Sequence, residues 1–431
     1  IRMLAVFLIA LFGLVIIGVP IAFSLVGTGF FMMLTQAINR PSAWSVFALA
    51  QKFVNGTDSV PLLAIPFFMI AGEIMTRGGI SRRIVDFAYS VLGRFKGGLG
   101  YVGILASMIF AGVSGSAVAD TTAVGSMMLP IMEGAGYDKP KSTGIICAAG
   151  CIGPIIPPST QMIFYGVCAE VSVSALFLGG IVPGILIGIG LMVAWFFHVR
   201  KRNYPVGPKT SLSGILKATK EAFLAICLPV FIILCITTGV ATATETAALA
   251  VLYALIVSGL VYREFKIKEW PHLMINAMKS TAVMMFVVGS AQVAAYMVTT
   301  CAIPQLLAKA ILSMTHSPIT FMILVNVLLI LVGCVMDSGP AIMILTPILL
   351  PIAKSFGLDP IYFGVVMVAN LCIGLATPPV GNVLYCGVSL SKVKLSDLIK
   401  ASLPFIGVMY LVLLLITMFP ELILFVPKVM G

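Results

Sequence analysis

The chain has 431 residues, of which 60% are hydrophobic and 10% charged, and its formal net charge is +11. A soluble domain is about a quarter charged, so this composition excludes a soluble protein and predicts an all-α polytopic membrane protein. The basic residues lie in short segments between apolar runs, which is the positive-inside pattern, and nucleic acid is not expected as a partner. The nine cysteines form no CxxC pair and are expected to be buried hydrophobes.

Six apolar runs are long enough, or nearly so, to cross a bilayer core, which takes about 20 helical residues. They are 5–34, 173–197, 222–240, 246–262, 319–336 and 402–427. The first run is too long for the core of a cleavable signal peptide. Three segments between the runs are rich in Arg and Lys and are expected in the cytoplasm: 76–98, 198–220 as a loop, and 263–272. Apolar positions in the first of these recur at helical spacing, which favours an amphipathic helix on the membrane surface.

An interrupted apolar run over 101–132 predicts a re-entrant hairpin. The interrupting residues are Ser114, Gly115, Ser116, Asp120, Thr121 and Thr122, and the arms on either side of them are too short to cross. We therefore place the tip of this hairpin near 112–120. The stretch "CIGPIIPPST" at 151–160 then breaks the helix expected over 143–168, because its prolines remove backbone donors. Such a break survives at membrane depth only where protein or water surrounds it.

The same features recur 221 residues later. "LPIMEGAGYD" at 129–138 returns as "LPIAKSFGLD" at 350–359, and the ungapped alignment of the 39 positions from 129 and from 350 contains 13 identities. Internal duplication is the favoured interpretation, and convergent use of helix-breaking residues is the alternative. In the second copy the hairpin tip is "DSGP" at 337–340, a turn sequence, and the break is "CIGLATPPVG" at 372–381.

The number of crossings between the copies indicates how they face. Five crossings separate equivalent points, and because five is odd the copies are expected to have inverted topology. Inverted repeats that are both interrupted by Gly and Pro are typical of secondary transporters, which bind their substrate near the middle of the membrane. The breaks are therefore predicted to be functional.

Each repeat offers unwound carbonyls and hydroxyls, the oxygen ligands that hard cations such as Na⁺ prefer. The helix N-termini after the breaks offer free N–H groups to an anion. The candidate substrate- and ion-binding residues are Ser114, Gly115, Ser116, Asp120, Gly153, Pro154, Pro157, Pro158 and Ser159 in the first repeat, and Asp337, Ser338, Gly339, Gly374, Thr377, Pro378, Pro379 and Asn382 in the second. Na⁺ is expected at Ser114, Ser116, Gly153, Asp337, Gly374 and Thr377.

Structural roles stay open for several of these residues. The two serines of the first tip could serve close helix packing, and Asp120 and Asp337 could cap the helices that follow them. Elsewhere, Glu245 in "ATATETAALA" fits a helix cap better than a ligand, and Glu73 is placed to form an i,i+4 ion pair with Arg77.

The motifs "GVSGSAVADTTAVG", "AGYD", "IGPIIPPS" followed by "YG", "TATETAA" and "GLATPPVG" resemble the large membrane subunit of tripartite ATP-independent periplasmic (TRAP) transporters, along essentially the whole chain. The resemblance implies a multi-pass protein of the bacterial inner membrane with an elevator-type fold of the ion-transporter superfamily. It implies Na⁺-coupled import of an organic acid anion, such as a C4-dicarboxylate or a sialic acid, with no organic cofactor and no enzymatic activity. The implied partners are a separate small membrane subunit and a periplasmic substrate-binding protein.

The expected organisation is a scaffold, two arms and a transport domain. The scaffold comprises 1–60 and 171–272, the arm regions are 61–98 and 273–318 with surface helices near 78–95 and 303–314, the transport domain comprises 99–170 and 319–392, and one C-terminal helix occupies 393–431. A proton-coupled anion transporter or an ion channel is the alternative. An intramembrane serine protease is disfavoured, because no histidine lies within either broken core.

Overall fold

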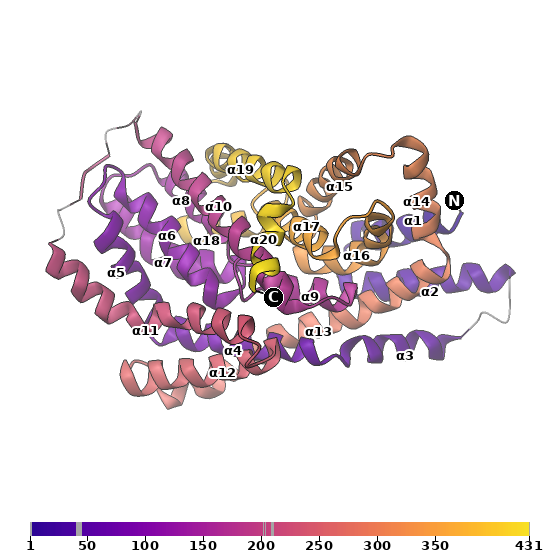
Figure 1. The fold of residues 1–431 in the computed structure, drawn as a ribbon, viewed down its shortest axis with the longest axis horizontal. Coiled ribbons are helices and arrows are strands. Elements are labelled where there is room, and N and C mark those ends of the chain that lie inside the picture. Colours follow the sequence, from indigo (N-terminus) through magenta and orange to yellow (C-terminus); the bar gives the residue numbers. More distant parts are fainter. Residues whose placement is uncertain (1, 40–44, 201, 203, 208–210, 431) are drawn as a thin grey trace.

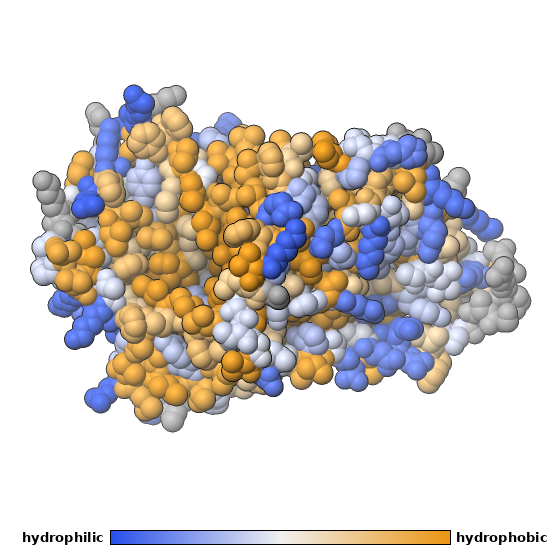
Figure 2. Space-filling view, in the orientation of Figure 1, coloured by the Kyte–Doolittle hydropathy of each residue, from blue (hydrophilic) through white to orange (hydrophobic). Residues whose placement is uncertain are grey.

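The computed structural model describes residues 2–39, 45–200, 202, 204–207 and 211–430. These residues form helices and no strand, apart from one isolated β-bridge between Lys96 and Val206. Eight helices of this part of the chain are long and apolar enough to cross a membrane, which confirms the expected all-helical, multi-pass architecture. Hydrophobic side chains cover much of the face seen in Figure 2, as a lipid-embedded surface requires.

The N-terminal part contains α1 (Arg2–Ile16), α2 (Ile21–Asn39), α3 (Val46–Thr57), a 3₁₀ turn at Val60–Leu63 and α4 (Ala64–Arg77). The apolar run 5–34 is two helices rather than one crossing, because Gly18 has a φ of +93° and Pro20 cannot continue the preceding helix. The expected ion pair is confirmed, with Arg77 Nε 3.4 Å from Glu73 Oε2.

The first repeat contains α5 (Ile80–Leu92), α6 (Gly98–Ser114), α7 (Ala117–Gly134), α8 (Lys139–Gly150) and α9 (Thr160–Ala169). The amphipathic helix expected near 78–95 is α5, which buries Ile80, Ile84 and Ala88 on one face. The interruptions fall where the sequence predicts them, between α6 and α7 and between α8 and α9.

The middle of the chain contains α10 (Val173–Arg200), α11 (Leu212–Thr237), α12 (Ala243–Leu255) with a π-helical end at Ile256–Val261, a 3₁₀ turn at Ile267–Glu269, and α13 (Trp270–Thr300). The expectation of a loop over 198–220 is wrong for its second half. Ser211 caps α11 by accepting a hydrogen bond from the Gly214 N–H at 3.1 Å, so this helix begins within the basic segment. The capping role of Glu245 is confirmed, because Glu245 forms a capping box with Thr242.

The second repeat contains α14 (Ile303–Met314), α15 (Pro318–Gly333), α16 (Ser338–Ser355), α17 (Pro360–Gly374) and α18 (Asn382–Ser391). The arms of the hairpins were expected to be too short to cross, but α7 and α16 have 18 residues each, and α16 is among the eight helices of spanning length. The segment 393–431 contains two helices rather than one, α19 (Leu395–Met418) and α20 (Glu421–Met430), which Pro420 separates.

The duplicated sequence produces duplicated structure. A shift of 221 residues converts the bounds of α7 into those of α16, and it converts the cis peptide Pro157–Pro158 into the cis peptide Pro378–Pro379. The repeats also exchange contacts: α9 packs against α16 and α17, and α18 packs against α7 and α8 (Figure 1). The hairpins and the breaks of both repeats therefore form one packed unit.

Candidate functional site

Each hairpin tip contacts the break of its own repeat. We call the contact between tip 1 (112–121) and break 1 (150–160) junction 1, and the contact between tip 2 (333–340) and break 2 (374–381) junction 2. Both junctions lie within the packed unit, so the sequence-predicted tips and breaks do come together in pairs.

The tip of junction 1 touches the start of α9. Ser116 is the N-cap of α7 and accepts a hydrogen bond from the Ala119 N–H at 3.5 Å. Gly115 has a φ of +60°, and a side chain there would collide with the carbonyl of Pro158. The Thr160 hydroxyl donates to the Gly115 carbonyl at 3.2 Å. The glycine is therefore required both by the turn and by the close approach of the break.

Asp120 is the buried carboxylate of junction 1. Its side chain is fully buried, and the Ser114 hydroxyl donates to its Oδ1. Its Oδ2 has no hydrogen-bond partner among the described residues and faces Gly153, where an added side chain would collide with it. Because Ser116 caps α7, Asp120 does not serve as the cap that the sequence left open.

The next residue of α7 carries a second buried oxygen without a partner among the described residues. Thr121 Oγ1 is buried, lacks a hydrogen-bond partner within the described part of the chain, and faces Gly150 at the end of α8. Buried polar atoms are nearly always satisfied, and an exception calls for an unseen ion, proton or water. No group of three or more His, Cys, Asp or Glu that could hold a metal ion is present among the described residues. The two unpartnered donors of junction 1 are a carboxylate oxygen and a hydroxyl oxygen, and hard cations prefer oxygen ligands.

The rest of break 1 is buried and internally bonded. Ser159 caps α9 by accepting from the Met162 N–H at 3.1 Å, and its hydroxyl donates to the Pro154 carbonyl. Pro154, Pro157 and Pro158 are all buried. They have no N–H to donate, so only their carbonyls remain for a cation.

Junction 2 uses its carboxylate differently. Asp337 is the N-cap of α16, and its Oδ1 accepts from the Ser338 N–H at 2.7 Å. The capping role that the sequence left open is confirmed here. Asp337 occupies the position equivalent to Ser116, so both tips place a cap at the same point of the repeat.

Backbone contacts close junction 2. The Val380 N–H donates to the Cys334 carbonyl at 3.1 Å, and an added side chain at Gly374 would lie 2.8 Å from the backbone of Gly333. The Thr377 hydroxyl donates to the Ile373 carbonyl and is 3.0 Å from Tyr410 Oη on α19. This hydroxyl, predicted as a Na⁺ ligand, therefore already has two partners.

A cavity of about 330 Å³ connects the two repeats. It is bounded by Gln161 on α9, by Asp337 and Gly339 at tip 2, and by Ser280 on α13. Asp337 is the one ionisable residue among the described residues that line it. The Gln161 Oε1 is buried without a hydrogen-bond partner in this part of the chain. Of the remaining candidates, Ser338 is buried, while Pro379 and Asn382 are exposed and do not reach this cavity.

Sequence reasoning missed Thr121, Gln161 and Ser280 as site residues. Thr121 follows Asp120 directly and Gln161 lies one residue inside α9, so their positions beside a tip and a break were the available signal. Ser280 has no such signal. It lies in the middle of a long apolar helix, and only the packing of α13 against α16 brings it to the cavity.

The fold matches that of a solved transporter. Over 86% of each chain, with a TM-score of 0.63 and 15% sequence identity, it is similar to the YdaH transporter of Alcanivorax borkumensis. The arrangement of helices thus defines a polytopic membrane protein with the fold of a transporter. Residues 8–422 match the family described as "Tripartite ATP-independent periplasmic transporter, DctM component". The chain belongs to this family, whose members are transport proteins rather than enzymes, and it is a multi-pass protein of the inner membrane.

Individual relatives match along nearly the whole length. The chain is 42% identical over 419 residues, 97% of each chain, to the 2,3-diketo-L-gulonate TRAP transporter large permease protein YiaN of Escherichia coli K12. It is 39% identical over 387 residues to the C4-dicarboxylate TRAP transporter large permease protein DctM of Pseudomonas aeruginosa, covering 90% of this chain and 91% of that one. It is 37% identical over 416 residues, 96% of each chain, to the sialic acid TRAP transporter large permease protein SiaM of Vibrio cholerae.

Proposed function

We propose that this protein imports an organic acid anion, of the C4-dicarboxylate, sialic acid or diketogulonate type, by symport with Na⁺. The three substrate types are those named for relatives at 37–42% identity. The observation that carries the proposal is the cavity of about 330 Å³ in which the N-terminal end of α9 meets tip 2. This size suits a small organic ligand.

Na⁺ is proposed to bind first at junction 1. Asp120 Oδ2 and Thr121 Oγ1 are buried without partners among the described residues, the first against Gly153 and the second against Gly150. A carboxylate without a cation or proton is costly in such a setting. Na⁺ would satisfy both oxygens and would fix the tip against the break. The alternative is that Asp120 carries a proton, and a comparison of uptake driven by a Na⁺ gradient with uptake driven by a proton gradient distinguishes the two.

The substrate anion is proposed to bind in the cavity beside Asp337. The free N–H groups at the start of α9 attract negative charge, and the amide of Gln161 and the hydroxyl of Ser280 can donate hydrogen bonds. Asp337 would repel the anion, because two like charges disfavour one another at short range. A second Na⁺ between Asp337 and the substrate removes this repulsion, so that neither binds well without the other. This dependence is the proposed basis of coupling.

Movement of the packed unit is proposed to carry the substrate across the membrane. The exchanged contacts of α9 and α18 tie the two repeats together, which supports rigid-body movement of 99–170 and 319–392 against a scaffold. The substrate is proposed to arrive from a periplasmic binding protein, and a small membrane subunit is proposed to complete the scaffold.

Uptake into proteoliposomes tests this function. The full chain is reconstituted with its small subunit, and a radiolabelled C4-dicarboxylate or sialic acid is presented on the matching binding protein. We expect accumulation only with an inward Na⁺ gradient, and Gln161→Ala to raise the KM about tenfold, the effect of one lost hydrogen bond to a charged group. Uptake that a proton gradient drives equally well without Na⁺ would contradict the sodium coupling. Ionic currents in the absence of substrate would favour the alternative function of an ion channel.

A further inference from the structure

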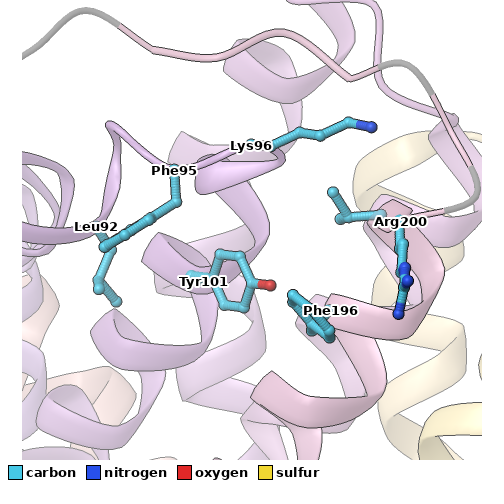
Figure 3. A pocket seen from close by; sticks show the side chains of 7 residues that line it. Leu92, Phe95, Lys96, Tyr101, Phe196 and Arg200 are labelled. Atoms are coloured by element: carbon cyan, nitrogen blue, oxygen red, sulfur yellow. The ribbon is translucent and has the colours of Figure 1, made fainter.

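A second cavity, far from both junctions, lies where α5, α6 and α10 meet. Its volume is about 480 Å³, and it is lined by Leu92, Phe95, Lys96, Tyr101, Phe196, Val199 and Arg200. Figure 3 shows Leu92 and Phe95 on one side and Phe196 and Arg200 on the other, with the Tyr101 hydroxyl pointing toward Phe196 between them. None of these residues belongs to the transport site described above.

The walls of this cavity are held in place by specific contacts. Trp195 on α10 donates from Nε1 to the Gly97 carbonyl at 2.9 Å. The turn that carries Lys96 pairs with the segment after α10, through the β-bridge of Lys96 with Val206 and a 3.4 Å hydrogen bond from the Gly97 N–H to the Pro205 carbonyl. These contacts join the turn before α6 to α10 and to the segment that follows it, and so hold the backbone on two sides of the cavity.

The cavity lies at the level of the membrane interface. Arg200 is the last residue of α10, which is a helix of spanning length and apolar up to its final turn. Phe95 is 46% exposed and Phe196 is 52% exposed, so large apolar side chains reach the surface next to the charged end of the helix. This pattern of apolar and cationic groups suits the boundary between acyl chains and headgroups.

Two cations and one hydroxyl in the cavity have no partner among the described residues. Neither Lys96 nor Arg200 has a carboxylate within ion-pair distance among the described residues, and no acidic residue lines the cavity. The Tyr101 hydroxyl likewise makes no hydrogen bond within the described part of the chain. In Figure 3, Lys96 extends along the upper edge of the cavity toward the side on which α10 carries Arg200.

We propose that this cavity binds an anionic phospholipid of the surrounding membrane. The phosphate would bind between Lys96 and Arg200 and accept a hydrogen bond from Tyr101, and an acyl chain would lie along Leu92, Phe95 and Phe196. Basic cavities between membrane helices are suited to anionic headgroups. A free inorganic phosphate would satisfy the cations and leave the apolar walls unfilled, so the combination of both surfaces selects a lipid.

Thermal unfolding of the purified, delipidated full chain tests this site. Phosphatidylglycerol and phosphatidylcholine with the same acyl chains are titrated into the detergent micelles, and inorganic phosphate is titrated separately. We expect phosphatidylglycerol to raise the midpoint of unfolding with a half-saturating mole fraction at least about tenfold lower than that of phosphatidylcholine, because two cations face its headgroup. Inorganic phosphate is expected to produce no shift.

The double variant Lys96→Gln/Arg200→Gln is expected to abolish this preference. The matched control is Lys217→Gln/Lys220→Gln, which removes the same charge from exposed positions on α11 outside the cavity and should keep it. Phe196→Ala should weaken both lipids without changing their ratio. The proposal is overturned if the two lipids stabilise the wild-type chain equally, which would leave the cavity to a protein partner. It is also overturned if inorganic phosphate matches the anionic lipid, or if the double variant retains the preference.

Discussion

Junctions 1 and 2 have the same backbone frame and different chemistry. Both combine a capped helix start with a break that contains a cis Pro–Pro peptide. In junction 1 the break is buried and the carboxylate of Asp120 lies inside the helix, with one oxygen unpartnered among the described residues. In junction 2, Pro379 and Asn382 are exposed, and the carboxylate of Asp337 is the cap itself and borders a cavity.

This difference shows how duplication can separate two tasks. The repeated frame supplies two places where helical backbone is interrupted, and the side chains placed on each frame then differ. Junction 1 is closed by protein and is the proposed ion site. Junction 2 opens to the cavity and is the proposed site of the substrate and of the ion that we propose couples to it. The account therefore predicts unequal responses to matched changes in the two junctions.

The largest expected effect is on folding, at the glycines of the two breaks. A side chain at Gly374 would lie 2.8 Å from the backbone of Gly333, which cannot move aside, whereas one at Gly153 would collide mainly with the Asp120 side chain and would lie 3.1 Å from the nearest backbone atom, the Gly150 carbonyl oxygen. Gly374→Ala should therefore destabilise the protein by about 3 kcal/mol and Gly153→Ala by about 1 kcal/mol. Denaturation of the purified variants measures both values. Equal losses of stability in the two variants would contradict the proposal that junction 2 is packed more tightly than junction 1 at its glycine.

Asp120→Asn should reduce Na⁺-driven uptake by about 100-fold, a loss of roughly 2.7 kcal/mol. Asparagine keeps the shape and the contact with Ser114 but lacks the charge that a buried cation requires. Initial uptake rates in proteoliposomes measure the effect, and the Na⁺ dependence of the residual rate shows whether affinity or turnover has changed. Wild-type rates in this variant would rule out Asp120 as a coupling residue.

Thr121→Val should weaken Na⁺ binding about tenfold, because one neutral oxygen ligand is removed. It should leave folding stability nearly unchanged, since the lost hydroxyl makes no hydrogen bond with the described residues. Thr122→Val is the control. The Thr122 hydroxyl donates to the Val118 carbonyl at 2.7 Å, so its removal should cost about 1 kcal/mol of stability and leave the Na⁺ dependence intact. An unchanged Na⁺ dependence in Thr121→Val, with a weakened one in Thr122→Val, would contradict a Na⁺ site at Thr121.

The smallest effect concerns the cap at junction 2. Asp337→Ala should destabilise the protein by about 1 kcal/mol, while Asp337→Asn, which can still cap α16, should change stability by less than about 0.5 kcal/mol. Because Asp337→Asn also removes the charge beside the substrate cavity, substrate binding should become less dependent on Na⁺. Calorimetric titration of substrate at low and high Na⁺ checks this second effect, which an unchanged dependence would contradict.

The sequence predicts much of the frame and less of the side-chain chemistry. The prolines of both breaks, the "DSGP" turn and the offset of 221 residues locate the tips and breaks, because backbone breaks have strong local signals. Local sequence alone does not distinguish Asp120 from a cap, since Ser116 and Asp120 both occur near the start of α7. The partner of Thr377 is Tyr410, 33 residues away on α19, and only tertiary packing reveals it. The position of Ser280 at the cavity likewise depends on tertiary packing, of α13 against α16.

The most direct test of the account measures thermal unfolding of the full chain without substrate, with Na⁺ titrated against K⁺ at constant ionic strength. A ligand at about 100 times its dissociation constant stabilises the folded state by roughly 2.7 kcal/mol. The account predicts a saturable, Na⁺-specific rise in the unfolding midpoint that Asp337→Asn retains and Asp120→Asn loses. Equal curves for Na⁺ and K⁺ in the wild-type chain, or a Na⁺ response that survives in Asp120→Asn, would contradict a sodium site at junction 1.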